Sequence, residues 1–172
     1  KLLKRYSGDN MPSFDLVSAL DIGELKNVLN MAQKQISGRY DFKGSKCSIE
    51  LKNEKELEVL AETEMRIEAA MSIFYGCMSK RGLGLKCLDV QKMVPTGNQM
   101  YKQSIILNSG ISKENGKVIN KLIKESNCKV SSQYLDEKIR VTSKKIDELQ
   151  KTFQMLRNHD DLKIDVMMEN MK

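Results

Sequence analysis

One short loop of the sequence carries the residue types that binding of a nucleotide requires. Phosphates attract cations, a flat base stacks on an aromatic ring, and a glycine lets the backbone approach a ligand because it has no Cβ. All three kinds occur within residues 39–46, as Arg39, Tyr40, Phe42, Lys43, Gly44 and Lys46. The loop is therefore a candidate nucleotide site. In the competing interpretation, the two aromatic rings anchor the loop in a core or an interface.

A second set of cations lies in the last third of the chain, where Arg140, Lys144 and Lys145 stand close together. Guanidinium and ammonium groups at such spacing can share the charge of one phosphate group or two. The sequence thus predicts two phosphate-binding groups. We expect the ligand either in a cleft between the two domains described below or against the second sheet.

The potential nucleophiles and metal ligands lack the spacing that catalysis needs. The four cysteines form no C-x-x-C pair and His159 is the only histidine, so a zinc site lacks its usual ligands. No Walker-A loop or dinucleotide fingerprint occurs. We therefore expect a protein that is not an enzyme and that has no metal and no cofactor. Scattered cysteines are typical of the reducing cytoplasm, and no apolar run is long enough to span a membrane.

Around these residues, strand-like runs alternate with amphipathic segments of helix length. Apolar residues recur at helical spacing in four segments, which are 21–36, 64–80, 111–126 and 143–156. Shorter runs with alternating apolar and polar residues predict strands at 14–18, 47–52, 57–61, 85–90, 102–108, 128–134, 138–142 and 162–168. The order strand-helix-strand-strand-helix-strand thus occurs twice.

This repeated order predicts an α+β protein of two tandem ferredoxin-like domains. Each domain is expected to have a four-stranded antiparallel sheet with two helices on one face. Turn-forming residues place the boundary at a linker, 95–98, between domains 11–94 and 99–172; residues 1–10 are expected to be a tag or an N-terminal extension. Strands 14–18 and 102–108 occupy equivalent places, so the sequence leaves open whether the two domains exchange them.

The uncovered sheet faces differ in their expected charge. In the first domain the outward residues of the central strands lean acidic, and they are Ser48, Glu50, Lys52, Glu58 and Glu62. In the second domain the corresponding residues include no acid, and they are Lys129, Ser131, Gln133, Lys138, Arg140 and Thr142. Because like charges repel, the second sheet is the one expected to bind a polyanion if either sheet does. Neither face carries the stacked aromatic rings of an RNA-recognition module.

A row of lysines, Lys113, Lys117, Lys121 and Lys124, follows the third helix opposite its apolar side. Two interpretations remain open. The row is either an electrostatic footprint for nucleic acid or an ordinary solvated helix face.

The loop 39–46 together with Ser48–Leu51 resembles the signature of the YajQ family. Further matches occur at 11–15, 80–82 and 140–145, so that the resemblance covers nearly everything from Met11 to Arg157. It implies two ferredoxin-like domains, nucleotide binding and, for some members, binding of cyclic-di-GMP.

The residues and the resemblance together predict a non-enzymatic nucleotide-binding protein. Its ligand is expected to be a purine nucleotide, either cyclic-di-GMP or GTP or ATP. As a cyclic-di-GMP effector it would act through a partner protein. The alternative is a charge-driven protein that binds RNA or another nucleic acid.

Overall fold

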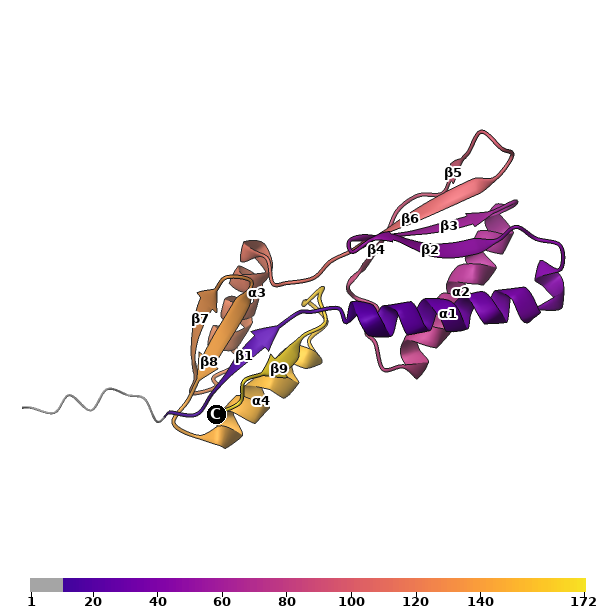
Figure 1. Ribbon diagram of the computed structural model, residues 1–172. Helices are drawn as coiled ribbons and strands as arrows, with labels where there is room; N and C mark the ends of the chain where they lie inside the picture. The colour runs from indigo at the N-terminus through magenta and orange to yellow at the C-terminus, as the bar shows by residue number, and fades with distance from the viewer. Residues whose placement is uncertain (1–10) are drawn as a thin grey trace, which may run out of the picture. The chain divides into compact units, whose positions relative to one another are not determined.

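The computed structural model describes residues 11–172, and the expected tag or extension at 1–10 lies outside the described residues. The chain forms two compact units. Residues Leu20–Ser109 form one of them, called here the continuous unit. The segment ending at Ala19 joins Gly110–Lys172 to form the other, called the split unit. Each unit contains one antiparallel sheet and two helices (Figure 1). The α+β class and the ferredoxin-like architecture are thus confirmed.

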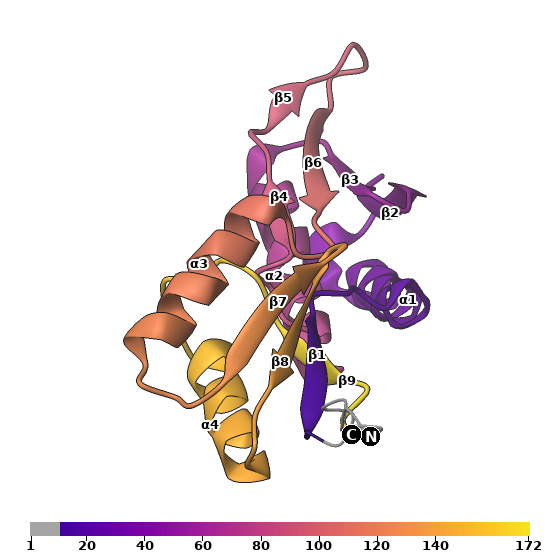
Figure 2. The same cartoon turned by 90° about the vertical axis from the view of Figure 1, so that its left-hand side faces the viewer.

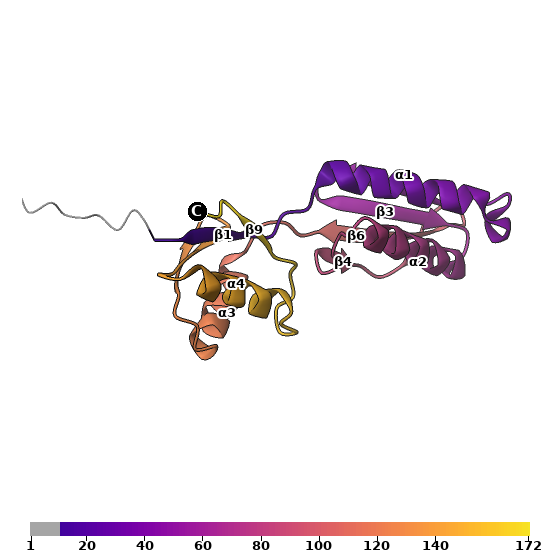
Figure 3. The same cartoon turned by 90° about the horizontal axis from the view of Figure 1, so that it is seen from below.

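The continuous unit has a sheet with the strand order β2-β3-β6-β4, and the short strand β5 also pairs with β6. Both helices lie on one face of this sheet (Figure 3). Its elements are α1 (Ile22–Gly38), the 3-10 turn η1 (Tyr40–Phe42), β2 (Ser48–Asn53), β3 (Glu56–Ala61), α2 (Glu64–Lys80), β4 (Leu88–Val90), β5 (Val94–Pro95) and β6 (Tyr101–Leu107).

Sequence periodicity explains how these elements pack. In β3 the residues Leu57, Val59 and Ala61 are fully buried, whereas the residues between them are partly exposed, as expected for a sheet with one covered face. Asp21 caps the N-terminus of α1, and its carboxylate accepts a hydrogen bond from the Glu24 amide at 3.0 Å. The buried stripes of α1 and α2 meet the covered face and form the core of this unit.

The split unit has the strand order β7-β8-β1-β9, with both helices on one face (Figure 2). Its elements are β1 (Ser13–Val17), α3 (Lys113–Glu125), β7 (Ser131–Leu135), β8 (Lys138–Thr142), α4 (Ile146–Arg157) and β9 (Met167–Glu169). Phe14 and Leu16 of β1 are fully buried in its core with Ile139 and Val141 of β8.

The two units exchange equivalent strands. The first strand of the chain, β1, pairs with β8 and β9, whereas β6 occupies the corresponding central place between β3 and β4. The units are therefore not the consecutive halves 11–94 and 99–172. Residues 95–98 are not a linker either, since Val94–Pro95 pair with β6 and the turn that follows closes a hairpin. The chain instead passes between the units after Ala19 and after Ser109.

Candidate nucleotide site

The loop 39–46 follows the end of α1, and its two aromatic residues have opposite environments. Phe42 is 5% exposed and belongs to the core of the continuous unit, whereas Tyr40 is 88% exposed. The turn η1 explains the difference, because two residues two positions apart on a tight turn point in different directions. Phe42 is therefore an anchor, and its expected role as a stacking partner for a base is wrong. Tyr40 retains an accessible ring face.

The cations of this loop also differ from one another. Arg39 donates hydrogen bonds from Nε and Nη2 to the two carboxylate oxygens of Asp41, at 3.0 and 2.8 Å. Its guanidinium lies 5.6 Å from the centre of the Phe42 ring. In contrast, Lys43 and Lys46 are exposed, and neither has an ion-pair partner among residues 11–172. The two lysines are thus the loop's available charges, while the charge of Arg39 is already balanced.

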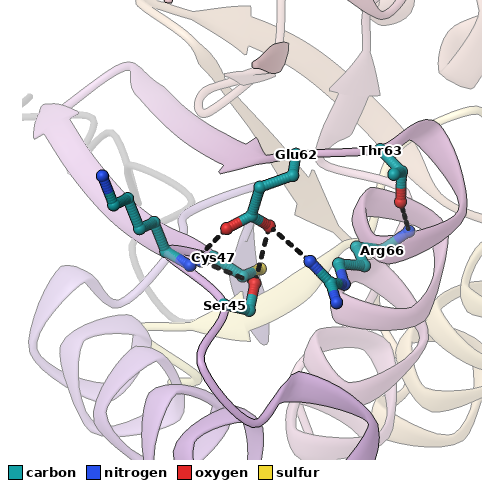
Figure 4. A network of polar contacts seen from close by, with 6 residues as sticks. Ser45, Cys47, Glu62, Thr63 and Arg66 are labelled. Atoms are coloured by element: carbon teal, nitrogen blue, oxygen red, sulfur yellow. Dashed lines mark hydrogen bonds and ion pairs between the residues drawn. The ribbon is translucent and has the colours of Figure 1, made fainter. Parts of the chain in front are cut away.

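Glu62, which directly follows β3, holds the far end of the loop (Figure 4). Its carboxylate accepts hydrogen bonds from the Ser45 hydroxyl at 2.7 Å, from the backbone amide of Lys46 and from Nη1 of Arg66 at 3.0 Å. Ser45 Oγ in turn accepts a hydrogen bond from the Cys47 amide at 3.1 Å. One carboxylate therefore ties the loop to both the sheet and α2.

The environment of Glu62 keeps this carboxylate ionised. Burial by itself raises the pKa of Glu62, but the hydrogen bonds from the Lys46 amide, Ser45 and Arg66 outweigh it and bring the pKa down to about 2. Hydrogen bonds to an ionised acceptor are stronger than those between neutral groups. Burial, helped by the charge of Glu62, raises the pKa of the neighbouring Cys47 thiol to about 11. This thiol is consequently protonated at neutral pH and is a poor nucleophile.

The open face of the continuous unit's sheet carries opposed charges. Glu50 on β2 lies opposite Glu58 on β3. Lys52 Nζ lies between them, 3.3 Å from Glu58 and 3.9 Å from Glu50. Two like charges directly opposite each other on neighbouring strands repel, and the charge of Lys52 offsets much of this repulsion.

Arg140, the first member of the second predicted group, lies on β8 of the split unit. Its Nε and Nη2 donate to the carboxylate of Asp15 at 3.0 and 3.5 Å, and Asn170 donates to the same carboxylate at 3.0 Å. The hydrogen bond from Arg140 is the main reason that the pKa of Asp15 is lowered. The expectation that this face carries no acid is wrong, because the exchanged strand β1 supplies Asp15 directly opposite Arg140.

Lys144 and Lys145 lie in the short segment between β8 and α4, and both are exposed. Lys145 precedes the first residue of α4, and its amide donates to Ser143 Oγ at 3.2 Å. The structure thus places the predicted residues in two groups. The loop residues belong to the continuous unit, whereas Arg140, Lys144 and Lys145 belong to the split unit.

Five residues around these groups did not enter the prediction, and they are Asp15, Ser45, Glu62, Arg66 and Asn170. Strand alternation identified Glu62 only as a further outward acid. An isolated acid between Phe14 and Leu16 was the available signal for Asp15, since a charge inside an apolar strand needs a partner. The spacing of four residues between Glu62 and Arg66 was the available signal for that ion pair. The bonds of Ser45 and Asn170 join positions that are far apart in the sequence, so no local pattern indicates them.

Residues 11–172 bring no three His, Cys, Asp or Glu side chains together in an arrangement that could hold a metal ion. None of the helices in that range is long and apolar enough to cross a membrane.

The fold and the loop together define a class of protein, namely tandem ferredoxin-like units that present an aromatic ring beside unpaired cations. Comparison with known proteins gives the family. The profile of the family described as nucleotide-binding protein YajQ-like matches residues 12–172. The chain belongs to this YajQ family.

Individual relatives extend over most of the chain. A protein of Geotalea daltonii named nucleotide-binding protein is 42% identical over 162 residues, which are 94% of this chain and 99% of the relative. A nucleotide-binding protein of Syntrophotalea carbinolica is 43% identical over 150 residues, covering 87% and 92% of the two chains. A nucleotide-binding protein of Bdellovibrio bacteriovorus is 43% identical over 147 residues, which are 86% of this chain and 91% of the relative. These names describe binding and state no reaction.

Proposed function

We propose that this protein binds a purine nucleotide through the loop 39–46, with Tyr40 stacking on the base and Lys43 and Lys46 neutralising phosphate. The observation that carries the proposal is the 88% exposure of Tyr40 beside two lysines without ion-pair partners. Exposing the apolar face of an aromatic ring to water is unfavourable, and a stacked base would remove this face from water. The names of the relatives agree with a nucleotide as the ligand.

The anchoring of the loop supports the same proposal. Phe42 is buried at one end of the loop, and Glu62 holds Ser45 and the Lys46 amide at the other. A segment fixed at both ends loses little conformational entropy when a ligand binds. Gly44, with φ +75°, lies between the two lysines and leaves the backbone there open to a phosphate.

In this proposal the protein acts as a non-enzymatic effector. Cyclic-di-GMP is the preferred ligand, since its two bases and two phosphates can use both the ring and the lysines, and GTP and ATP are the alternatives. Binding would change the surface that a partner protein meets by favouring one of several conformations. Arg140, Lys144 and Lys145 remain a predicted second phosphate-binding group.

Replacing Tyr40 by alanine is expected to weaken nucleotide binding by about 5- to 150-fold, the range that corresponds to the loss of one base–aromatic stack. Isothermal titration calorimetry with cyclic-di-GMP, GTP and ATP measures this change. Tyr40→Phe keeps the ring and should bind nearly as the unchanged protein does. Absence of heat with all three nucleotides at high micromolar concentration would refute nucleotide binding, and equal binding by Tyr40→Ala would move the site away from the loop.

A further inference from the structure

Helix α3 of the split unit presents a continuous row of lysines to solvent. Lys113, Lys117, Lys121 and Lys124 follow one another at spacings of three and four residues, which places them on one side of the helix. All four are exposed. The only ion pair that any of them makes within residues 11–172 joins Lys121 Nζ to Glu125 Oε1 at 4.0 Å. Both partners of this pair are largely exposed, so that it holds little of the charge.

The opposite side of α3 is fully engaged in the fold. Ile119, Leu122 and Ile123 are 0%, 7% and 4% exposed and belong to the core of the split unit. Val118, 37% exposed, is the one large apolar side chain of Lys113–Glu125 that is exposed, and a single valine is far less than the apolar face that an amphipathic membrane-binding helix buries in a bilayer. The lysine side offers charge alone, which selects a partner with regularly spaced negative charges.

Several contacts fix α3 firmly on its sheet. A Cβ added to Gly116 would lie only 2.8 Å from Cδ2 of Tyr134, which shows how closely the helix approaches β7. The Tyr134 hydroxyl donates to the carbonyl of Ile111 at 2.6 Å, and the Ser132 hydroxyl donates to Oδ1 of Asn120 at 2.7 Å. The lysines consequently project from a rigid support, and their common spacing is kept.

The length of the row is comparable to several repeats of a nucleic-acid backbone. With a rise of about 1.5 Å per residue, the row from Lys113 to Lys124 spans about 16 Å. One strand of a duplex carries a phosphate every 3.4 Å or so along the axis, which gives about five phosphates over that length. The row contains no aromatic residue that could stack on an unpaired base, which favours contact with the backbone of a duplex over contact with single-stranded bases.

From these observations we infer that the lysine side of α3 binds the phosphate backbone of a nucleic-acid duplex. This contact is independent of the nucleotide loop, because α3 belongs to the split unit and the loop to the continuous unit. It also differs from the Arg140 surface, since α3 covers one face of the sheet (Figure 2). Arg140 lies on the other face, because it alternates along β8 with the buried residues Ile139 and Val141. Recognition would depend on charge and shape and would show little sequence preference.

The double variant Lys117→Gln/Lys121→Gln tests this inference. Binding of a fluorescent RNA hairpin, and of a DNA duplex of the same sequence, is measured by anisotropy from 50 to 300 mM salt. The loss of two phosphate contacts should reduce the slope of log K against log salt by about 2 and weaken binding at 50 mM salt about tenfold or more. Lys117→Arg/Lys121→Arg keeps the charge and should bind as the unchanged protein does.

A matched control separates this surface from the overall positive charge of the protein. Lys26→Gln/Lys34→Gln removes the same charge from exposed positions of α1 in the other unit and should leave the slope nearly unchanged. Equal losses in both double variants, or absence of RNA and DNA binding at 50 mM salt, would overturn the inference. So would binding to phosphatidylserine vesicles without binding to either duplex. Circular dichroism confirms that each variant is folded, and Tyr40→Ala should not alter duplex binding.

Discussion

Replacing Phe42 by alanine should lower the free energy of unfolding of the continuous unit by about 3–5 kcal/mol, the cost of removing a large buried ring from a core. Phe42 is 5% exposed and packs with the buried residues of α1 and α2. The substitution also removes the ring over which the Arg39 guanidinium lies. Urea unfolding followed through the amide resonances of this unit measures the change without mixing in the split unit.

Tyr40→Ala is the control for this prediction, because the two aromatic residues lie in the same turn. Tyr40 is 88% exposed, and its removal should alter the free energy of unfolding by no more than about 0.5 kcal/mol. The pair of variants thus separates anchoring from binding. Similar losses of stability in both variants would show that Phe42 does not anchor the loop as the packing indicates.

Glu62→Gln is expected to have the second largest effect, a loss of about 2–3 kcal/mol of stability at neutral pH, because Ser45, the Lys46 amide and Arg66 all donate hydrogen bonds to the charged carboxylate. The pKa of Glu62 is about 2 in the folded protein and near 4.5 as an ordinary value. Since the folded pKa is the lower one, the ionised carboxylate stabilises the fold fully above about pH 4.5, and this contribution disappears as the pH falls towards 2. The difference in stability between the unchanged protein and the variant should therefore shrink over that range.

Urea unfolding of both proteins at a series of pH values between 2 and 7 tests this dependence. Glu68→Gln, an exposed carboxylate of α2, is the matched control and should produce a small difference at every pH. A constant difference between Glu62→Gln and the unchanged protein from pH 7 to pH 2 would show that the ionised form of Glu62 does not hold the loop.

Most of the secondary structure could be predicted because its signals are local. Asp21 caps α1 as its position before an apolar helical pattern indicates, and the expected segment 64–80 agrees with α2, Glu64–Lys80. Strand partners were not predictable in the same way. Phe14 and Leu16 in β1 have the same alternation as Ile105 and Leu107 in β6, so either strand satisfies either sheet by periodicity alone.

The candidate site was predictable in the identity of its residues but not in their orientation. Tyr40 and Phe42 have similar rings, and the tight turn between them decides which ring is buried. The pairing of Arg39 with Asp41 is equally a matter of side-chain geometry. Contacts between distant parts of the sequence were the hardest to predict. The contact between Asp15 and Arg140 joins positions 125 residues apart and exists only because β1 is exchanged.

This exchange of strands also sets the order in which a newly made chain can fold. Every strand of the continuous unit lies between Leu20 and Ser109, so that this unit can close once β6 has left the ribosome. The strand β1 emerges first, but its partners β8 and β9 emerge last, and at about 5–20 residues per second the 125 residues from Asp15 to Arg140 take roughly 6 to 25 s to synthesise. During that interval β1 is an unpaired apolar strand, which is prone to pair with other chains. A chain whose translation stops early would retain a complete continuous unit attached to an exposed strand, and limited proteolysis of stalled chains would detect that species.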